Sequence, residues 1–292
     1  MTGATSTISD RKAQIDEQEL KVRERMNKVR HKIAVISGKG GVGKSTVTVN
    51  LAMAFAMHGH VNRVGILDAD IHGPSVPKML GIAGQRLQVG PPGAFPASGP
   101  LGIKVVSMDF LLPDENSPVI WRGPLKMSAI RQFLSDIVWG DLDILLIDLP
   151  PGTGDEPLSV AQLLPEMDGV VIVTIPSDVS QIIVKKSAFF ARQLGMPIIG
   201  IIENMSGFVC PKCGFRADIF QSGGGRKIAE ELRIPFLGSI PIDQRVCQDS
   251  DKGTPFILEH VDSPASKSFA EIVDRVRGFL KKKEKTKKTE EK

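Results

Sequence analysis

A ten-residue segment of glycine, lysine and hydroxyl side chains constrains the fold of this 292-residue chain more than any other feature. It reads Ser37-Gly-Lys-Gly-Gly-Val-Gly-Lys-Ser-Thr46 and lies between an apolar run, Lys32–Ile36, and a helical pattern, Val47–Met57. Strand, glycine-rich loop and helix in this order are the context that the G-x-x-x-x-G-K-[ST] pattern needs to bind phosphate. The sequence therefore predicts a nucleotide-binding loop inside an α/β domain.

Each residue type in the loop has a chemical reason. Glycines let the backbone turn tightly, so that successive N–H groups point at the phosphates, and the next helix adds its positive end. Lys44 is expected to reach the β- and γ-phosphates, and Ser45 to ligate Mg²⁺ through its hydroxyl. The predicted nucleotide-binding residues of the loop are Gly38, Lys39, Gly40, Gly41, Val42, Gly43, Lys44, Ser45 and Thr46.

Apolar runs that do not alternate with polar residues predict the rest of the sheet. They are Val64–Leu67, Ile103–Met108, Ile144–Ile147, Gly169–Thr174, Ile198–Ile202 and Phe236–Ile240. Helical patterns lie between and after them, at Lys126–Val138, Ser180–Leu194, Gly225–Leu232 and Ser263–Leu280. Such runs suit parallel strands covered on both sides. The alternation predicts a doubly wound α/β fold, with a mostly parallel sheet, helices on both faces and ligands at the carboxyl ends of the strands.

Charge divides the chain into three predicted segments: a charged helical extension over residues 1–31, an ATPase domain over 32–280, and a disordered lysine-rich tail over 281–292. The tail holds seven lysines and three glutamates, and so accounts for the whole net charge of +4. Residues 1–280 balance at 30 basic and 30 acidic side chains. A neutral body argues against a nucleic-acid-binding surface, which needs a basic stripe.

Several classes of protein are excluded by what the sequence does not contain. No stretch approaches the ~20 apolar residues of a membrane span. The first ten residues are polar and lack the apolar core of a signal peptide. Three cysteines do not make a disulfide framework. We therefore expect a cytoplasmic protein with neither a membrane nor a nucleic acid as partner.

Acidic residues follow two of the predicted strands. Asp68-Ala-Asp70 comes after Val64–Leu67, and Asp148 comes after Ile144–Ile147. A carboxylate at such a strand end can orient Mg²⁺-bound water, and phosphoryl transfer depends mainly on positioning and charge neutralisation. Asp148 also opens a proline–glycine segment that is arranged like a loop sensing the γ-phosphate. Turn and helix-cap roles for these acids remain the alternative.

The loop has an additional lysine, Lys39, before Lys44, and this lysine narrows the class of nucleotide-binding protein. Lys39-Gly-Gly-Val-Gly-Lys-Ser-Thr46 resembles the deviant Walker A loop of MinD/ParA-type ATPases, in which the early lysine reaches the partner's nucleotide across a dimer interface. The resemblance implies a homodimer with ATP between its subunits. It also implies that Asp70 orients the attacking water and that Asp68 and Asp148 hold Mg²⁺-bound water. An exposed lysine with no special role is the alternative for Lys39.

Cys210-Pro-Lys-Cys213 is the second chemical feature, a knuckle whose thiolates converge on one metal. One pair supplies two ligands, whereas tetrahedral zinc or a four-iron cluster needs about four. Cys247 stands alone, and we expect it to be a small, partly buried apolar residue. Two symmetric knuckles would supply four thiolates at a dimer axis. The residues alone leave zinc, an iron–sulfur cluster and metal-free thiols open, and disfavour a thioredoxin-like redox pair.

Further motifs resemble one branch, the Mrp/ApbC-type iron–sulfur cluster carrier ATPases, from about Lys32 to Leu258. They are Asp70-Ile-His-Gly-Pro-Ser75, Trp121-Arg-Gly-Pro124, Asp148-Leu-Pro-Pro-Gly-Thr-Gly-Asp155 and Glu203-Asn-Met-Ser206. The resemblance implies ATP and Mg²⁺, slow hydrolysis, and a labile [4Fe–4S] cluster held by Cys210 and Cys213 at a homodimer interface for transfer to apoproteins. Asn204 would then read adenine, unless it caps a turn.

One alternative function remains, a MinD/ParA-like positioning ATPase with a structural zinc knuckle. A MinD-like protein would lay an apolar and basic C-terminal helix on the bilayer. Ser263–Lys283 has an apolar face and a basic end, but packing on the sheet explains that face more simply. Some carriers have an additional N-terminal cysteine cluster, which residues 1–32 lack. An N-terminal cluster is therefore excluded.

Overall fold

The computed structural model describes the whole chain except residues 1–2, 71–72, 112–122, 165, 211 and 291–292. Within the described part, eight strands form one sheet in the order β12-β9-β8-β1-β7-β2-β6-β5. Their bounds are β1 Val29–Ile36, β2 Val64–Asp68, β5 Ala97–Ser98, β6 Lys104–Ser107, β7 Leu142–Asp148, β8 Gly169–Thr174, β9 Ile198–Glu203 and β12 Phe236–Ser239. All neighbouring pairs are parallel except β5 and β6. The predicted mostly parallel sheet is confirmed.

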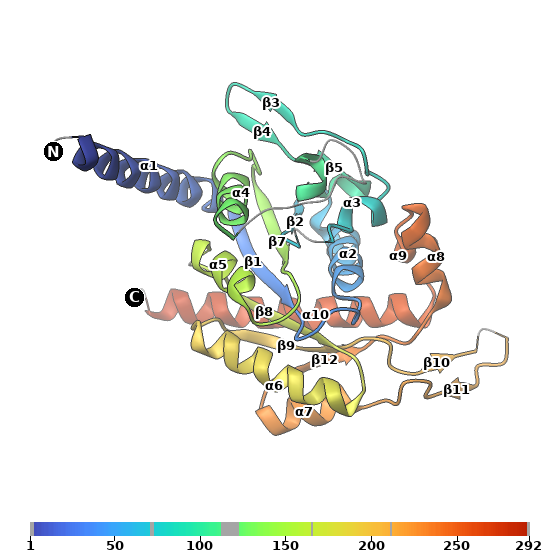
Figure 1. Cartoon of the computed structure of the whole chain (residues 1–292). Coiled ribbons are helices and arrows are strands. Elements are labelled where there is room, and N and C mark those ends of the chain that lie inside the picture. Colours follow the sequence, from blue (N-terminus) through green and yellow to red (C-terminus); the bar gives the residue numbers. More distant parts are fainter. Residues whose placement is uncertain (1–2, 71–72, 112–122, 165, 211, 291–292) are drawn as a thin grey trace.

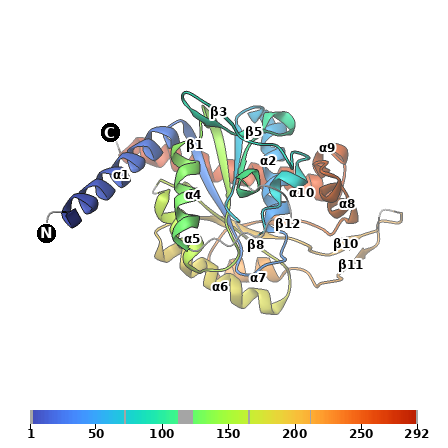
Figure 2. The same cartoon turned by 45° about the horizontal axis from the view of Figure 1, so that its top comes forward.

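Helices cover both faces of this sheet, as Figures 1 and 2 show. One face carries α2 Lys44–Phe55, α3 Val76–Met79, α8 Gln244–Lys252, α9 Phe256–Glu259 and α10 Pro264–Glu290; the other carries α1 Gly3–Met26, α4 Gly123–Ser135, α5 Asp155–Leu163, α6 Asp178–Gln193 and α7 Gly224–Leu232. Along β1, Ile33 and Val35 face one core while Ala34 and Ile36 face the other. Both faces of the strand are buried, which explains the unbroken apolar run.

The two chain ends differ from the predicted boundaries. β1 begins at Val29, which pairs with Leu142 of β7, so the domain starts before residue 32. α10 continues to Glu290, and the prediction of a disordered tail is therefore wrong for residues 281–290. Lys283 donates to the carbonyl of Asp168 at 2.9 Å, and Glu284 accepts from Arg30 at 2.8 Å. These partners lie at the amino ends of β1 and β8, and they fix the charged C-terminal part of α10 against the sheet.

Smaller elements complete the described part. β3 Gln88–Gly90 pairs with β4 Gly93–Phe95, and β10 Phe208–Val209 pairs with β11 Arg216–Ala217. Short turns of other helix types occupy Ala56–His60, Pro100–Gly102 and Met108–Leu111. The β10–β11 hairpin extends away from the sheet in both views. No helix among the described residues is long and apolar enough to cross a bilayer.

Candidate functional site

The predicted phosphate loop lies at the carboxyl end of β1 and leads into α2. Gly43 is the N-cap residue of α2 and adopts the left-handed conformation, with φ 77°. A Cβ atom at Gly43 would lie 2.3 Å from Asn204 Nδ2, and one at Gly38 would lie 2.0 Å from Ile183 Cγ2 of α6. These two glycines are therefore required because the loop packs directly against neighbouring elements, in addition to the turn that it makes.

Three side chains from the start of α2 converge on Asp148, which ends β7 and is fully buried. Lys44 Nζ lies 2.7 Å from Oδ1, Thr48 Oγ1 donates to Oδ1 at 2.9 Å, and Ser45 Oγ donates to Oδ2 at 2.5 Å. A buried carboxylate is stable only when it is paired and hydrogen-bonded in this way. The structure thus brings together the predicted residues Lys44, Ser45 and Asp148. Thr48, one helical turn after Lys44, was missed.

Asp68 lies beside Asp148 because β2 and β7 pair in a register that puts these two residues opposite each other. It is fully buried and accepts hydrogen bonds from the Ser107 hydroxyl at 3.1 Å and the N–H of Asp70 at 3.2 Å. Burial, and then the nearby charge of Asp148, raise the pKa of Asp68 to about 8. Both effects oppose the charged form of Asp68, which a bound cation would favour. Ser107 was not predicted as part of this site.

Three predicted roles stay predictions. Asn204, which is buried just after β9, donates from Nδ2 to the carbonyl of Val42 at 2.9 Å and so braces the loop. This hydrogen bond does not show whether Asn204 contacts adenine, and that role stays a prediction. Lys39 is partly exposed, and no described carboxylate forms an ion pair with it. Asp70 is partly exposed beside Asp68. His72, Trp121 and Arg122, which carried part of the resemblance, lie outside the described residues.

Cys210 and Cys213 lie in the turn that joins β10 to β11. The turn is closed by hydrogen bonds from Cys210 N to Phe215 O and from Gly214 N to Cys210 O, both at 2.9 Å. The N–H of Cys213, then that of Lys212, and then the Cys213 thiol lower the pKa of the Cys210 thiol. Within the described residues, no group of three or more histidine, cysteine or acidic side chains is placed to hold a metal. The hairpin therefore presents two thiols, of which Cys210 favours its thiolate, and no third ligand among the described residues.

Comparison with known proteins identifies the chain. Residues 28–277 match the family model described as ParA: NUBPL iron-transfer P-loop NTPase. The chain belongs to this family of iron-transfer P-loop NTPases. The predicted resemblance to a carrier branch of the MinD/ParA group is confirmed at the level of the family.

Individual relatives agree with the family. The NTPase is 56% identical over 271 residues to a protein of Methanocaldococcus jannaschii named iron-sulfur cluster carrier protein, covering 93% of this chain and 92% of that one. A nucleotide-binding protein from Archaeoglobus fulgidus, solved in complex with ADP, has a TM-score of 0.75 at 41% identity over 85% of this chain and 95% of that chain. The cell division protein MinD of Aquifex aeolicus has a TM-score of 0.61 at 22% identity, over 85% and 97% of the two chains, and shows the fold alone. The predicted P-loop NTPase fold is confirmed.

The prediction that Cys247 is partly buried is wrong. It lies on α8, a surface helix with no buried residue, and it is exposed rather than partly buried. Its Sγ is 4.0 Å from Asp251 Oδ2 on the same helix. The environment of Cys247 in the NTPase is therefore that of an ordinary surface thiol, separate from the hairpin cysteines.

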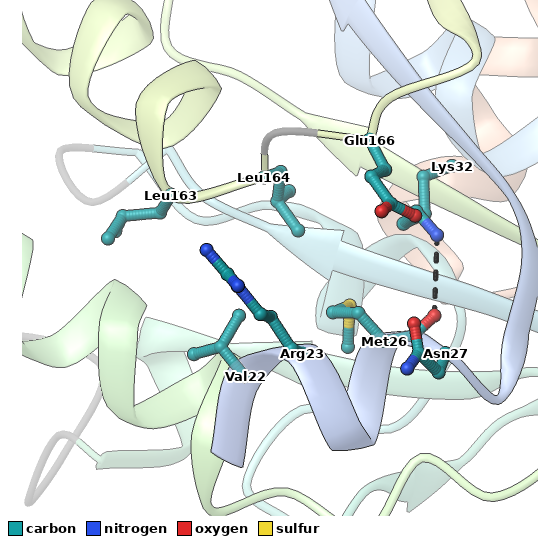
Figure 3. A pocket seen from close by; sticks show the side chains of 8 residues that line it. All are labelled: Val22, Arg23, Met26, Asn27, Lys32, Leu163, Leu164 and Glu166. Atoms are coloured by element: carbon teal, nitrogen blue, oxygen red, sulfur yellow. Dashed lines mark hydrogen bonds between the residues drawn. The ribbon is translucent and has the colours of Figure 1, made fainter. Parts of the chain in front are cut away.

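A cavity of about 280 Å³ lies between α1 and the end of α5 in this NTPase (Figure 3). Val22, Met26 and Leu164 form part of its apolar lining, and Arg23 and Glu166 add charge. Lys32 Nζ, at its edge, donates to the carbonyl of Met26 at 3.3 Å. The cavity lies near the amino ends of β1 and β8, whereas the phosphate loop follows the carboxyl end of β1. No predicted site residue lines this cavity.

Proposed function

We propose that this NTPase is an ATP-dependent carrier of iron–sulfur clusters. It binds a labile [4Fe–4S] cluster between two copies of the chain and transfers the cluster to apoproteins. The observation that carries this proposal is the pair of thiols, Cys210 and Cys213, in the turn of a projecting hairpin on a chain of the iron-transfer family. The name of the Methanocaldococcus jannaschii relative supports it.

The hairpin has the chemistry that a transferable cluster requires. Thiolates are the ligands of iron–sulfur clusters, and backbone N–H groups near Cys210 favour its thiolate. Two thiols are half of a four-thiolate set, so a second copy of the chain supplies the other half. Cys213 is exposed, which leaves the cluster accessible to an acceptor protein. The cluster is the cargo of the protein in this proposal.

The phosphate loop would hold ATP, with Lys44 on the phosphates and Lys39 on the nucleotide of the second copy. Hydroxyl and carboxylate oxygens are the donors that Mg²⁺ prefers, and the set made by Ser45, Asp148 and Asp68 fits that ion, which would neutralise phosphate charge. Ser45 would ligate it directly, and the two aspartates through water. Asp70 would orient the attacking water, and Asn204 would contact adenine.

Hydrolysis would be slow and coupled to loading or transfer of the cluster. ATP can change the affinity for the cluster only if ATP binds the open and closed dimers with different affinities. The cytoplasm suits this role because its reducing conditions keep cysteines free, as all three are in the structure. The alternative of a positioning ATPase with a structural zinc knuckle is supported only by the fold that MinD shares.

Anaerobic reconstitution with ferrous iron and sulfide tests the proposal. We expect about four irons per dimer and broad thiolate-to-iron absorption, followed by transfer to an apoprotein that accepts a [4Fe–4S] cluster. The Cys210→Ala/Cys213→Ala double variant should bind no cluster. Cys247→Ala removes an exposed cysteine elsewhere and is the matched control, which should load normally. Stoichiometric zinc that resists iron, or no metal in any variant, would contradict the proposal.

A further inference from the structure

The β10–β11 hairpin places Cys210 on the same face as Phe215. Its antiparallel register pairs Phe208 with Ala217, so Cys210 lies opposite Phe215, and Cys210 N donates to Phe215 O at 2.9 Å. Residues directly opposite each other share a face of a β-ladder, and residues two apart along one strand share it too. Cys210 and Phe215 therefore lie on one face, together with Phe208 and Ala217. Arg216 lies on the other.

The face that carries Cys210 is apolar and open to water. Phe215 is 68% exposed, and beyond the end of β11 Ile219 and Phe220 are 57% and 53% exposed. Arg216 and Asp218 lie between Phe215 and Ile219 in the sequence. They form an ion pair, with Arg216 Nε 3.9 Å from Asp218 Oδ1. We call Cys210, Phe215 and Ile219 the apolar hairpin face, and nothing in the described part of the chain covers its two large side chains.

Two features of this face point to the same occupant. Its thiol belongs to a pair that supplies half of a metal site, and no third ligand lies near it among the described residues. Its large apolar side chains lose water contact only if another apolar surface packs on them. A second copy of the chain brings both missing parts, because a twofold axis presents the same face to itself.

We propose that the apolar hairpin face is the contact surface between two copies in the cluster-loaded dimer, and that Phe215 and Ile219 of both copies seal the shared cluster from water. This inference rests on the proposed function. Phe215 and Ile219 are positioning residues here, since they bind no metal. The apolar surroundings of a metal site control the access of solvent. The two side chains would therefore set how fast the cluster is lost.

The test compares Phe215→Ser, Ile219→Ser and their double variant with the full-length wild-type protein after anaerobic loading. Val89→Ser is the matched control, because Val89 is 83% exposed on β3, away from the hairpin. Phe215→Leu keeps an apolar side chain at the tested position. The measurements are the mass of the loaded species by light scattering, iron per chain, the rate of iron loss to a ferrous chelator, and ATP affinity. Unchanged ATP affinity shows that the domain is folded.

We expect the double serine variant to lose iron at least about tenfold faster and to dissociate at higher concentration than the wild type. The single variants should fall between, and Val89→Ser and Phe215→Leu should behave as wild type. Loaded variants that stay dimeric and lose iron at the wild-type rate would overturn this inference and leave the proposed function intact. So would variants that differ only in transfer to an apoprotein, because the face would then contact the acceptor. A wild-type protein that binds no iron would overturn both.

Discussion

The phosphate loop and the cysteine hairpin are built in opposite ways. At the loop, Lys44, Ser45 and Thr48 all bond to one fully buried carboxylate, Asp148, and every partner comes from the same chain. At the hairpin, two thiols lie in an exposed turn with no third described ligand. The loop is therefore held by contacts within the chain, whereas the hairpin provides only part of a site.

This difference suits the two proposed ligands. A nucleotide that is bound many times by the same residues benefits from donors that are already in place. A cluster that must be handed on benefits from a site that opens when two subunits move apart. Four predictions test this difference. They ask whether a change at the phosphate loop leaves the hairpin unaffected, and whether the loop is held more tightly than the hairpin.

The largest effect is expected at Lys44. Lys44→Ala should lower the rate of ATP hydrolysis at least about 100-fold, because the charge that positions the phosphates is lost. Iron loading without nucleotide should stay at the wild-type level, since Lys44 pairs with Asp148 at the sheet whereas the two thiols lie in the projecting hairpin. Phosphate release and iron analysis measure the two. A parallel loss of iron loading without ATP would break the comparison.

Two glycines with similar positive φ angles provide the next test. Gly43 and Gly214 have φ of 77° and 72°, but a Cβ at Gly43 would meet Asn204 Nδ2 at 2.3 Å, whereas one at Gly214 would meet nothing within 4 Å. Gly43→Ala should destabilise by about 3 kcal/mol, from strain and overpacking, and Gly214→Ala by about 1 kcal/mol, from strain alone. Thermal and denaturant unfolding measure both. Equal losses would mean that the loop is not held as tightly as its contacts imply.

Thr48 gives a smaller effect within the loop region. Thr48→Val keeps the shape of the side chain and removes the hydrogen bond to Asp148, which should cost about 2 kcal/mol of unfolding free energy because the acceptor is charged and buried. Thr153→Val, at an exposed position after Asp148, is a control expected to cost less than about 0.5 kcal/mol. Urea unfolding at neutral pH provides the measurement. A cost at Thr48 no larger than that of the control would contradict the role assigned to this hydroxyl.

The smallest effect is expected far from both sites, at Asp168. Burial alone would raise its pKa, but the His31 ring, whose Nδ1 lies 3.5 Å from Oδ2, the hydrogen bond from the N–H of Lys32 and the charge of Lys283 lower that pKa to about 2. The folded pKa lies below the ordinary value of 3.8, so this stabilisation is present above about pH 4 and is lost as the pH falls towards 2.

Asp168→Asn should therefore lose on the order of 1 kcal/mol of stability at pH 6, after allowance for solvent screening, and show a smaller difference from wild type near pH 3. Guanidinium unfolding at both pH values measures the difference. An equal difference at the two pH values would show that the ionised carboxylate is not what holds α10 at this edge.

Local sequence predicted the parts of the site that are local in the chain. The loop, Lys44 and Asp148 follow from a motif and a strand end, which need no knowledge of the fold. The bond from Asn204 to Val42 joins residues 162 positions apart, and the bond from Ser107 to Asp68 depends on β6 lying beside β2. Such contacts require the order of strands, which the sequence pattern does not state.

The errors have the same cause. The hairpin strands are two residues long, too short for any periodicity to mark them. Composition predicted a disordered tail, but Lys283 and Glu284 find partners in β1 and before β8 that are distant in sequence. Cys247 was expected to be partly buried, but α8 lies on the surface without a buried residue. Each prediction treated a segment by itself where its neighbours decided the outcome.

The position of Asn204 has a mechanical consequence. Its side chain donates a hydrogen bond to the carbonyl of Val42 in the phosphate loop. The polypeptide then continues from Asn204, just after β9, into the hairpin that contains Cys210. An extended chain advances about 3.3 Å per residue, so the thiol lies within roughly 20 Å of that hydrogen bond. The residues after β9 therefore link the phosphate loop to the thiols by a short covalent path, which is tied to the end of β12 where Ser206 N donates to Ile240 O at 2.9 Å.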